Sequence, residues 1–143
     1  MPIRDKDAKL LDLLRANARE PAASLARKLG IARSTLQERI ARLEREGVIK
    51  GYTVRLSDDA AAKNFRAVVM IEADARQGDR VTAELRKMPE VRSLAAVSGV
   101  YDMMAVVETD TAARMDGILD RIGKAHGVAR TVSSIILSEK FSR

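Results

Sequence analysis

Residues 25–47 read LARKLGIARSTLQERIARLEREG, and this stretch decides the fold of the first part of the chain. Its apolar residues favour a short helix over residues 21–29, followed by Gly30. Glycine readily adopts the left-handed backbone that ends a helix sharply. A further helix is predicted over residues 33–47, because apolar side chains recur four and seven positions after Leu36. Two helices joined by such a turn form a helix-turn-helix.

The flanking sequence extends this motif on both sides. Residues 5–17 carry leucines at helical spacing, with Asp5 as the predicted N-cap. After residue 47 the sequence VIKGYTV (48–54) predicts a tight hairpin around Lys50 and Gly51, because β-branched and aromatic residues flank a glycine turn. Helix, helix, turn, helix and hairpin together predict a winged helix-turn-helix domain over residues 1–55.

The net charge of +6 is confined to this predicted domain. Residues 1–55 hold 13 Lys and Arg against 7 Asp and Glu, whereas residues 56–143 hold 13 of each. Such asymmetry predicts a polyanion partner for the first part and another role for the second. The alternative is a well-solvated basic surface without a partner.

The 33–47 helix offers a polar face to double-stranded DNA. With Leu36, Ile40 and Leu43 turned inward, the opposite face has the size and charge to enter a major groove. The residues expected to contact base edges are Arg33, Ser34, Thr35 and Glu38. Those expected to bind phosphates are Arg27, Lys28, Arg39, Arg42 and Arg45. The alternatives are a Glu38–Arg42 ion pair along the helix and a packing unit whose polar face is merely solvated.

The second part of the chain has a different pattern. A polar stretch over 56–64 is predicted to be a linker, and residues 65–143 a second domain. Strands are predicted over 65–74, 91–97, 103–109 and 129–137, with helices over 78–88 and from a cap at Asp110 or Thr111 to about residue 123. The order βαββαβ is that of a ferredoxin-like domain, so the fold class is α+β.

The predicted sheet needs a cover on its second face. Its strands at 68–71 and 105–107 are apolar on both sides, whereas two helices shield one side only. The cover we expect is an identical sheet, giving a twofold dimer. Two recognition helices on one axis would read a pseudo-palindrome with half-sites about 34–36 Å apart or a multiple of that spacing.

Other classes of site are not indicated. The sequence has no Cys, no phosphate-cradling glycine loop and no nucleophile–base arrangement, so no catalytic site, metal or cofactor is expected. The single histidine, His126, is expected to complement the dipole of a helix end. No signal peptide or membrane-spanning stretch is present, so we expect a cytoplasmic protein. Because no catalytic arrangement is indicated, we also expect that the protein is not an enzyme.

From end to end, the chain resembles transcriptional regulators of the Lrp/AsnC (feast/famine) family. The matching stretches are DAKLLDLLRANAR, SLARKLGIARSTLQERIARLEREGVIKGY, VSGVYDMMAVV and RTVSSIILSEKF. The resemblance implies a regulator associated with the nucleoid in a prokaryotic cytoplasm, and a dimer that often assembles into tetramers or octamers. Ala32 departs from the family pattern, which usually has a Ser capping the recognition helix.

The resemblance also implies a pocket between sheet domains where small effectors, commonly amino acids, bind. In this sequence the pocket residues are Gly99, Tyr101 and Asp102, with Thr131, Ser133 and Ser134 contributed by a neighbouring subunit. The chemistry fits, since amides beside Gly99 can approach a carboxylate and Asp102 can hold an ammonium group. The alternatives are an ordinary strand connection, with Asp102 bonded to turn amides, and simple sheet packing for Thr131 and Ser133.

These observations predict a sequence-specific DNA-binding regulator whose assembly and DNA affinity respond to a small effector, which we expect to be an amino acid. One alternative is an architectural DNA-binding protein that needs no effector. The other is an enzyme on the same scaffold, similar to the sirohaem decarboxylases, which would be expected to carry more histidines than one.

Overall fold

The computed structural model describes residues 5–57, 60 and 64–142, which form two compact units divided between Arg55 and Leu56. Five residues of the predicted linker, 58–59 and 61–63, lie outside the described residues. Within the described ranges, no helix is long and apolar enough to cross a membrane.

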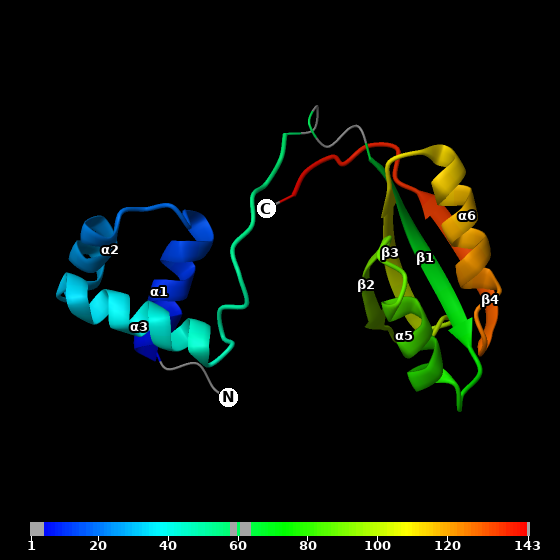
Figure 1. Ribbon diagram of the computed structural model, residues 1–143, viewed down its shortest axis with the longest axis horizontal. Helices are drawn as coiled ribbons and strands as arrows, with labels where there is room; N and C mark the ends of the chain where they lie inside the picture. Colours follow the sequence, from blue (N-terminus) through cyan, green and yellow to red (C-terminus); the bar gives the residue numbers. More distant parts are fainter. Residues whose placement is uncertain (1–4, 58–59, 61–63, 143) are drawn as a thin grey trace. The chain divides into compact units, whose positions relative to one another are not determined.

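In its described part, residues 5–55, the N-terminal unit contains three helices, α1 (Asp5–Ala16), α2 (Ala22–Leu29) and α3 (Arg33–Arg45) (Figure 1). Each helix buries one apolar stripe, and the shared core includes Leu10, Leu25, Leu36 and Leu43, all at most 2% exposed. The helical spacing of these leucines accounts for the amphipathic helices predicted from the sequence.

The α2–α3 turn depends on Gly30, whose φ of 64° is left-handed. The amide of Gly30 donates to the carbonyl of Arg27 at 3.2 Å, and the amide of Ile31 donates to Ala26 at 3.0 Å. These two bonds satisfy carbonyls that the end of a helix leaves free. The chain then starts α3 at Arg33, so the predicted helix-turn-helix is confirmed.

The hairpin predicted around Lys50 and Gly51 is wrong, because residues 48–57 contain no strand. A two-residue hairpin turn needs left-handed backbone, and Gly51 does not have it. The left-handed residue is Gly47, with φ 70°, and the amide of Ile49 donates back to Leu43 at 3.0 Å. The chain therefore turns at the end of α3 and continues to residue 57 without a strand partner among the described residues.

Over residues 64–142, the C-terminal unit is a four-stranded antiparallel sheet with two helices (Figure 1). Its elements are β1 (Phe65–Ala73), α5 (Gly78–Arg86), β2 (Val91–Ala96), β3 (Met103–Thr109), α6 (Ala112–Gly123) and β4 (Val128–Ile135). The strand order is β2-β3-β1-β4. This is the ferredoxin-like arrangement predicted from the element order.

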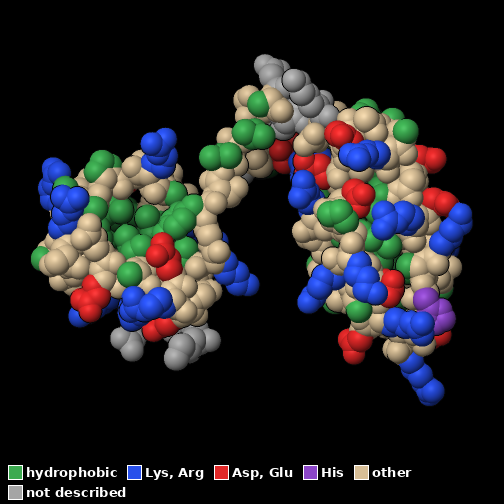
Figure 2. Space-filling model, viewed as in Figure 1, with side chains coloured by type: hydrophobic (Ala, Val, Ile, Leu, Met, Phe, Trp, Pro, Cys, Tyr) green, Lys and Arg blue, Asp and Glu red, His purple; other side chains and the backbone are tan. Residues whose placement is uncertain are grey.

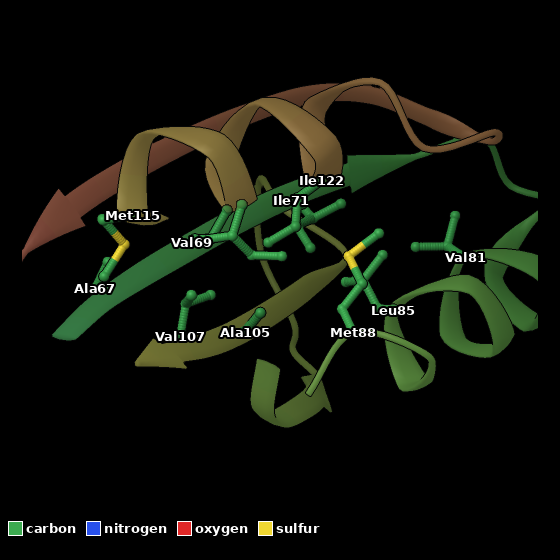
Figure 3. Packing of buried hydrophobic residues seen from close by; sticks show 11 residues of the cluster. Ala67, Val69, Ile71, Val81, Leu85, Met88, Ala105, Val107, Met115 and Ile122 are labelled. Carbon is green, nitrogen blue, oxygen red and sulfur yellow. The ribbon is translucent and has the colours of Figure 1, made fainter. Parts of the chain in front are cut away.

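Both helices pack on one face of the sheet. Val69 and Ile71 of β1 and Val107 of β3 point into this layer, where Val81 of α5 and Ile122 of α6 meet them (Figure 3). All five side chains are at most 1% exposed. Alternate strand residues point to opposite faces, which explains why every second residue of β1 and β3 is buried here.

The opposite face of the sheet is also apolar. It carries Val68 and Met70 of β1, paired across the ladder with Val106 and Met104 of β3, and all four are half-buried. Val132 of β4, paired with Met70, is 45% exposed. Neither α5 nor α6 covers these side chains, so the two-sided apolar sheet predicted from the sequence is confirmed.

Candidate nucleic-acid interface and effector site

The α3 helix presents a polar outer face. Leu36 and Leu43 are buried, and they fix the rotation of the helix. As predicted, Arg33, Ser34, Thr35, Glu38 and Arg45 are exposed. The N-terminal turns of α3 thus offer hydroxyl, carboxylate and guanidinium groups to a partner, which is what a major groove requires.

The guanidinium of Arg42 is held by the protein itself. Its Nη2 donates to both carboxylate oxygens of Asp7 at 2.9 and 3.0 Å, and its Nη1 donates to Glu46 at 3.2 Å. The bonds to Asp7 raise the pKa of Arg42 above its ordinary value. Arg39 Nε lies 3.9 Å from the same carboxylate. These contacts compete with the phosphate contacts predicted for Arg39 and Arg42, and Glu46 occupies the place of the Glu38 partner considered above.

The other residues predicted to bind phosphates differ in whether an acidic side chain of the protein already pairs with them. Lys28 Nζ lies 2.6 Å from Glu20, and its hydrogen bond, followed by that from Ser24, lowers the pKa of Glu20. In contrast, Arg27, Arg33 and Arg45 are exposed and have no ion-pair partner among the residues that the structure describes. In Figure 2, Lys and Arg side chains lie around the edge of the N-terminal unit with a few acidic side chains among them, and acidic and basic side chains are interspersed on the other unit.

Three further residues around α3 were not predicted from the sequence. Gln37 is exposed beside Arg33 and Ser34. Tyr52 donates from its hydroxyl to Glu44 at 2.8 Å and so ties the segment after α3 to that helix; burial and then this bond raise the pKa of Tyr52. Asp7 is 3% exposed. Its signal was its position three residues before Leu10, which puts a carboxylate on the apolar stripe of α1.

The β2–β3 turn is bonded to the neighbouring strands. Gly99 has φ 128°, a conformation that favours glycine. The amide of Asp102 donates to Ile71 at 3.0 Å, and its carboxylate accepts from the amide of Ala73 at 2.9 Å. Arg130 lies over the ring of Tyr101, with its Cζ 5.4 Å from the ring centroid. The carboxylate of Asp102 therefore ties the β2–β3 turn to β1, and binding an effector would be a second role for it.

The β4 residues of the predicted pocket divide between two faces. Thr131 pairs with Ile71 and Ser133 with Val69, so both belong to the face that the helices cover. Ser134 pairs with Val68 and belongs to the open face. Thr131 and Asp102 flank Ile71 from opposite sides, which brings β4 and the turn to the same end of the sheet.

No group of His, Cys, Asp or Glu in the described ranges is arranged to hold a metal ion.

Residues 66–143 match the family model of the Lrp/AsnC ligand binding domain, and residues 3–50 match a winged helix-turn-helix DNA-binding model. The chain belongs to the Lrp/AsnC family. It is a transcriptional regulator with a DNA-binding helix-turn-helix and a ligand-binding domain. The family assignment confirms both the resemblance and the α+β fold class read from the sequence.

Curated relatives of this Lrp/AsnC chain align over nearly its whole length. The HTH-type transcriptional regulator FL11 of Pyrococcus furiosus is 32% identical over 93% of this chain and 88% of its own. The regulator LrpA of Pyrococcus horikoshii is 30% identical over 96% of this chain and 98% of its own. Among solved structures, a feast or famine regulatory protein from M. tuberculosis complexed with L-methionine is 33% identical, with a TM-score of 0.83 over 99% of this chain and 96% of its own.

Proposed function

We propose that the chain regulates transcription by placing α3 in the major groove of a specific DNA site. The observation that carries the proposal is the exposed polar face of α3 within a helix-turn-helix. Arg33, Ser34, Thr35 and Glu38, joined by Gln37, would contact base edges. Each good bidentate contact of this kind contributes about 1–3 kcal/mol of discrimination between bases.

Arg27 and Arg45, which are exposed and have no ion-pair partner among the described residues, would supply phosphate contacts. Gel-shift competition against bulk genomic DNA tests whether binding is specific, since a specific site is expected to survive a roughly thousandfold excess of competitor. Equal competition by bulk DNA would instead support an architectural protein. The chain acts by binding in this proposal and catalyses no reaction.

The DNA-bound form would be a dimer joined through the open face of the sheet. Val68, Met70, Met104, Val106 and Val132 line this face, which neither helix covers. A second copy would bury these residues and place two α3 helices about one twofold axis. The operator would then be a pseudo-palindrome with half-sites about 34–36 Å apart or a multiple of it. Further assembly into tetramers or octamers would build on this dimer.

An amino acid would be the effector, bound near Gly99, Tyr101 and Asp102 with Thr131, Ser133 and Ser134 nearby or from a neighbouring subunit. Support comes from the matched ligand-binding domain and from the relative complexed with L-methionine. The effector would change DNA affinity by binding the assembly states unequally, because only differential affinity shifts an equilibrium.

The effector proposal is tested with Asp102→Asn. The amide oxygen can still accept from Ala73, so the strand connection is kept while the charge that would hold an ammonium group is lost. Sedimentation of the wild type with L-methionine and then with each other amino acid should reveal a ligand that alters assembly. Asp102→Asn should remove that response. A response equal to that of the wild type would contradict the role of Asp102.

A further inference from the structure

Asp7 is a buried carboxylate in the first turn of α1. It is 3% exposed, and both of its oxygens accept from Arg42 of α3, at 2.9 and 3.0 Å. Arg39, one turn earlier on α3, lies 3.9 Å away. A buried charge is costly unless it is paired, so this two-point contact holds α3 against α1 in a fixed orientation.

The contact divides the arginines of α3 into two kinds. Arg33 and Arg45 are exposed and have no ion-pair partner among the described residues, whereas Arg39 and Arg42 are half-buried and held by Asp7. Arg42 nevertheless lies on the flank of the outer face, one turn after Glu38. Once released from Asp7, this guanidinium would keep only its exposed contact with Glu46, at 3.2 Å, and would be available to a DNA backbone that α3 approaches.

We propose that Asp7 is a positioning residue for DNA recognition, which withholds Arg42, and more weakly Arg39, from DNA phosphates. The inference rests on the proposed function. Phosphate contacts carry no sequence information directly, so each additional one strengthens binding to every DNA sequence alike. By keeping guanidinium groups engaged inside the protein, Asp7 limits this indiscriminate part of the affinity and leaves the exposed side chains of α3 to distinguish bases.

The salt dependence of DNA binding by the full chain tests the proposal without knowledge of the operator. The probe is a short random-sequence duplex, titrated at several salt concentrations between about 50 and 200 mM. The logarithm of the binding constant falls with the logarithm of salt concentration by about 0.9 per phosphate contact. A merely structural role of Asp7 would change the folded fraction and leave this slope unaltered.

Asp7→Asn should steepen the slope by about 0.9 for each guanidinium released, and tighten binding at low salt. Asp12→Asn is the matched control, because it removes the same charge from an exposed position on α1 and should leave the slope as in the wild type. Asp7→Glu keeps a carboxylate at this position, so its slope should lie closer to the wild-type value than that of Asp7→Asn. A folded Asp7→Asn variant with the wild-type slope overturns the proposal.

Substitution of arginines on α3 gives an independent comparison. Arg42→Met should leave the slope unchanged. Arg45→Met removes an arginine of the same helix that has no ion-pair partner in the part of the chain that the structure describes, and it should reduce the slope by about 0.9. Circular dichroism checks that both variants keep their helices, and this pair decides the matter if Asp7→Asn does not fold. An equal reduction in both variants would show that Arg42 already binds phosphate and would overturn the proposal. A wild-type chain that does not bind the duplex overturns the proposed function and the inference with it.

Discussion

Two glycines of the C-terminal unit should respond in opposite ways to substitution by alanine. Gly127, between α6 and β4, has φ 92°, and a Cβ added there would lie 2.6 Å from the Cβ of Gln77. Gly117 lies on the exposed side of α6 and would accept a Cβ without contact. We expect Gly127→Ala to lower the free energy of unfolding by about 2–3 kcal/mol, from strain and overlap together. Gly117→Ala should raise it by up to about 1 kcal/mol. Urea denaturation followed by circular dichroism measures both, and shifts of the same sign would contradict this account.

The contact between Asp7 and Arg42 shows how far the sequence could be interpreted at the scale of single residues. Helical periodicity placed Arg42 on a flank of its helix, but the partner lies 35 residues away on another helix. Periodicity gives the direction of a side chain and not what meets it there. A carboxylate on the apolar stripe of α1 indicated an unusual site, and only the packed structure identifies the guanidinium that pairs with it.

The starts of α3 and α6 differ in their caps. Ala32 has the extended backbone of an N-cap but no side-chain bond, whereas the hydroxyl of Thr111 accepts from the amide of Arg114 at 3.2 Å. We expect Ala32→Ser to stabilise the N-terminal unit, and Thr111→Ala to destabilise the C-terminal unit, each by about 1 kcal/mol. Urea unfolding of the two variants beside the wild type is the measurement. An unchanged midpoint for Ala32→Ser would mean that the first amides of α3 are already satisfied.

The carboxylate of Glu20, just outside α2, is bonded to two side chains of that helix. Bonds from Lys28 and Ser24 lower the pKa of Glu20 below its ordinary value of 4.5. Because the folded-state pKa is the lower one, the contribution of Glu20 is fully present above about pH 4.5 and is lost as the pH falls through the folded-state pKa. The stability difference between the wild type and Glu20→Gln should therefore shrink on acidification. Chemical denaturation from neutral pH to pH 3 gives this difference, and a constant value would contradict the assignment.

At the scale of elements, the spacing of the apolar residues predicted helices and strands correctly where the segment offered only one pattern. The predicted strand over 103–109 has the bounds of β3, and all three N-terminal helices occur where they were expected. The hairpin prediction failed because the segment contains two glycines, Gly47 and Gly51, at which the chain could reverse direction. Ile49 packs against the helical core, and this contact favours the turn at Gly47 over one at Gly51. That choice depends on tertiary packing, which a local pattern does not contain.

The sequence predicts the effector site less completely than the fold. The two apolar faces of the sheet follow from alternation along single strands, so they could be derived from β1 and β3 alone. The six predicted pocket residues instead come from a turn and a strand, and Ser133 and Ser134 point to opposite faces of β4. Whether they meet around one ligand depends on what a neighbouring subunit contributes, which the periodicity of one chain does not specify.

The proposed dimer can be tested through a residue that a single chain leaves accessible. Val132 is 45% exposed on the open face, so Val132→Glu should fold normally. If a second copy covers this face, the dimer would bury an unpaired carboxylate, at a cost of about 3 kcal/mol, or more than a hundredfold in Kd. Ala113→Glu, on the exposed side of α6, is the control and should leave the dimer intact. Sedimentation velocity distinguishes the two variants. A Val132→Glu chain that remains dimeric at the wild-type concentration would mean that the subunits meet through another surface, and the half-site geometry inferred for the operator would then have to change with it.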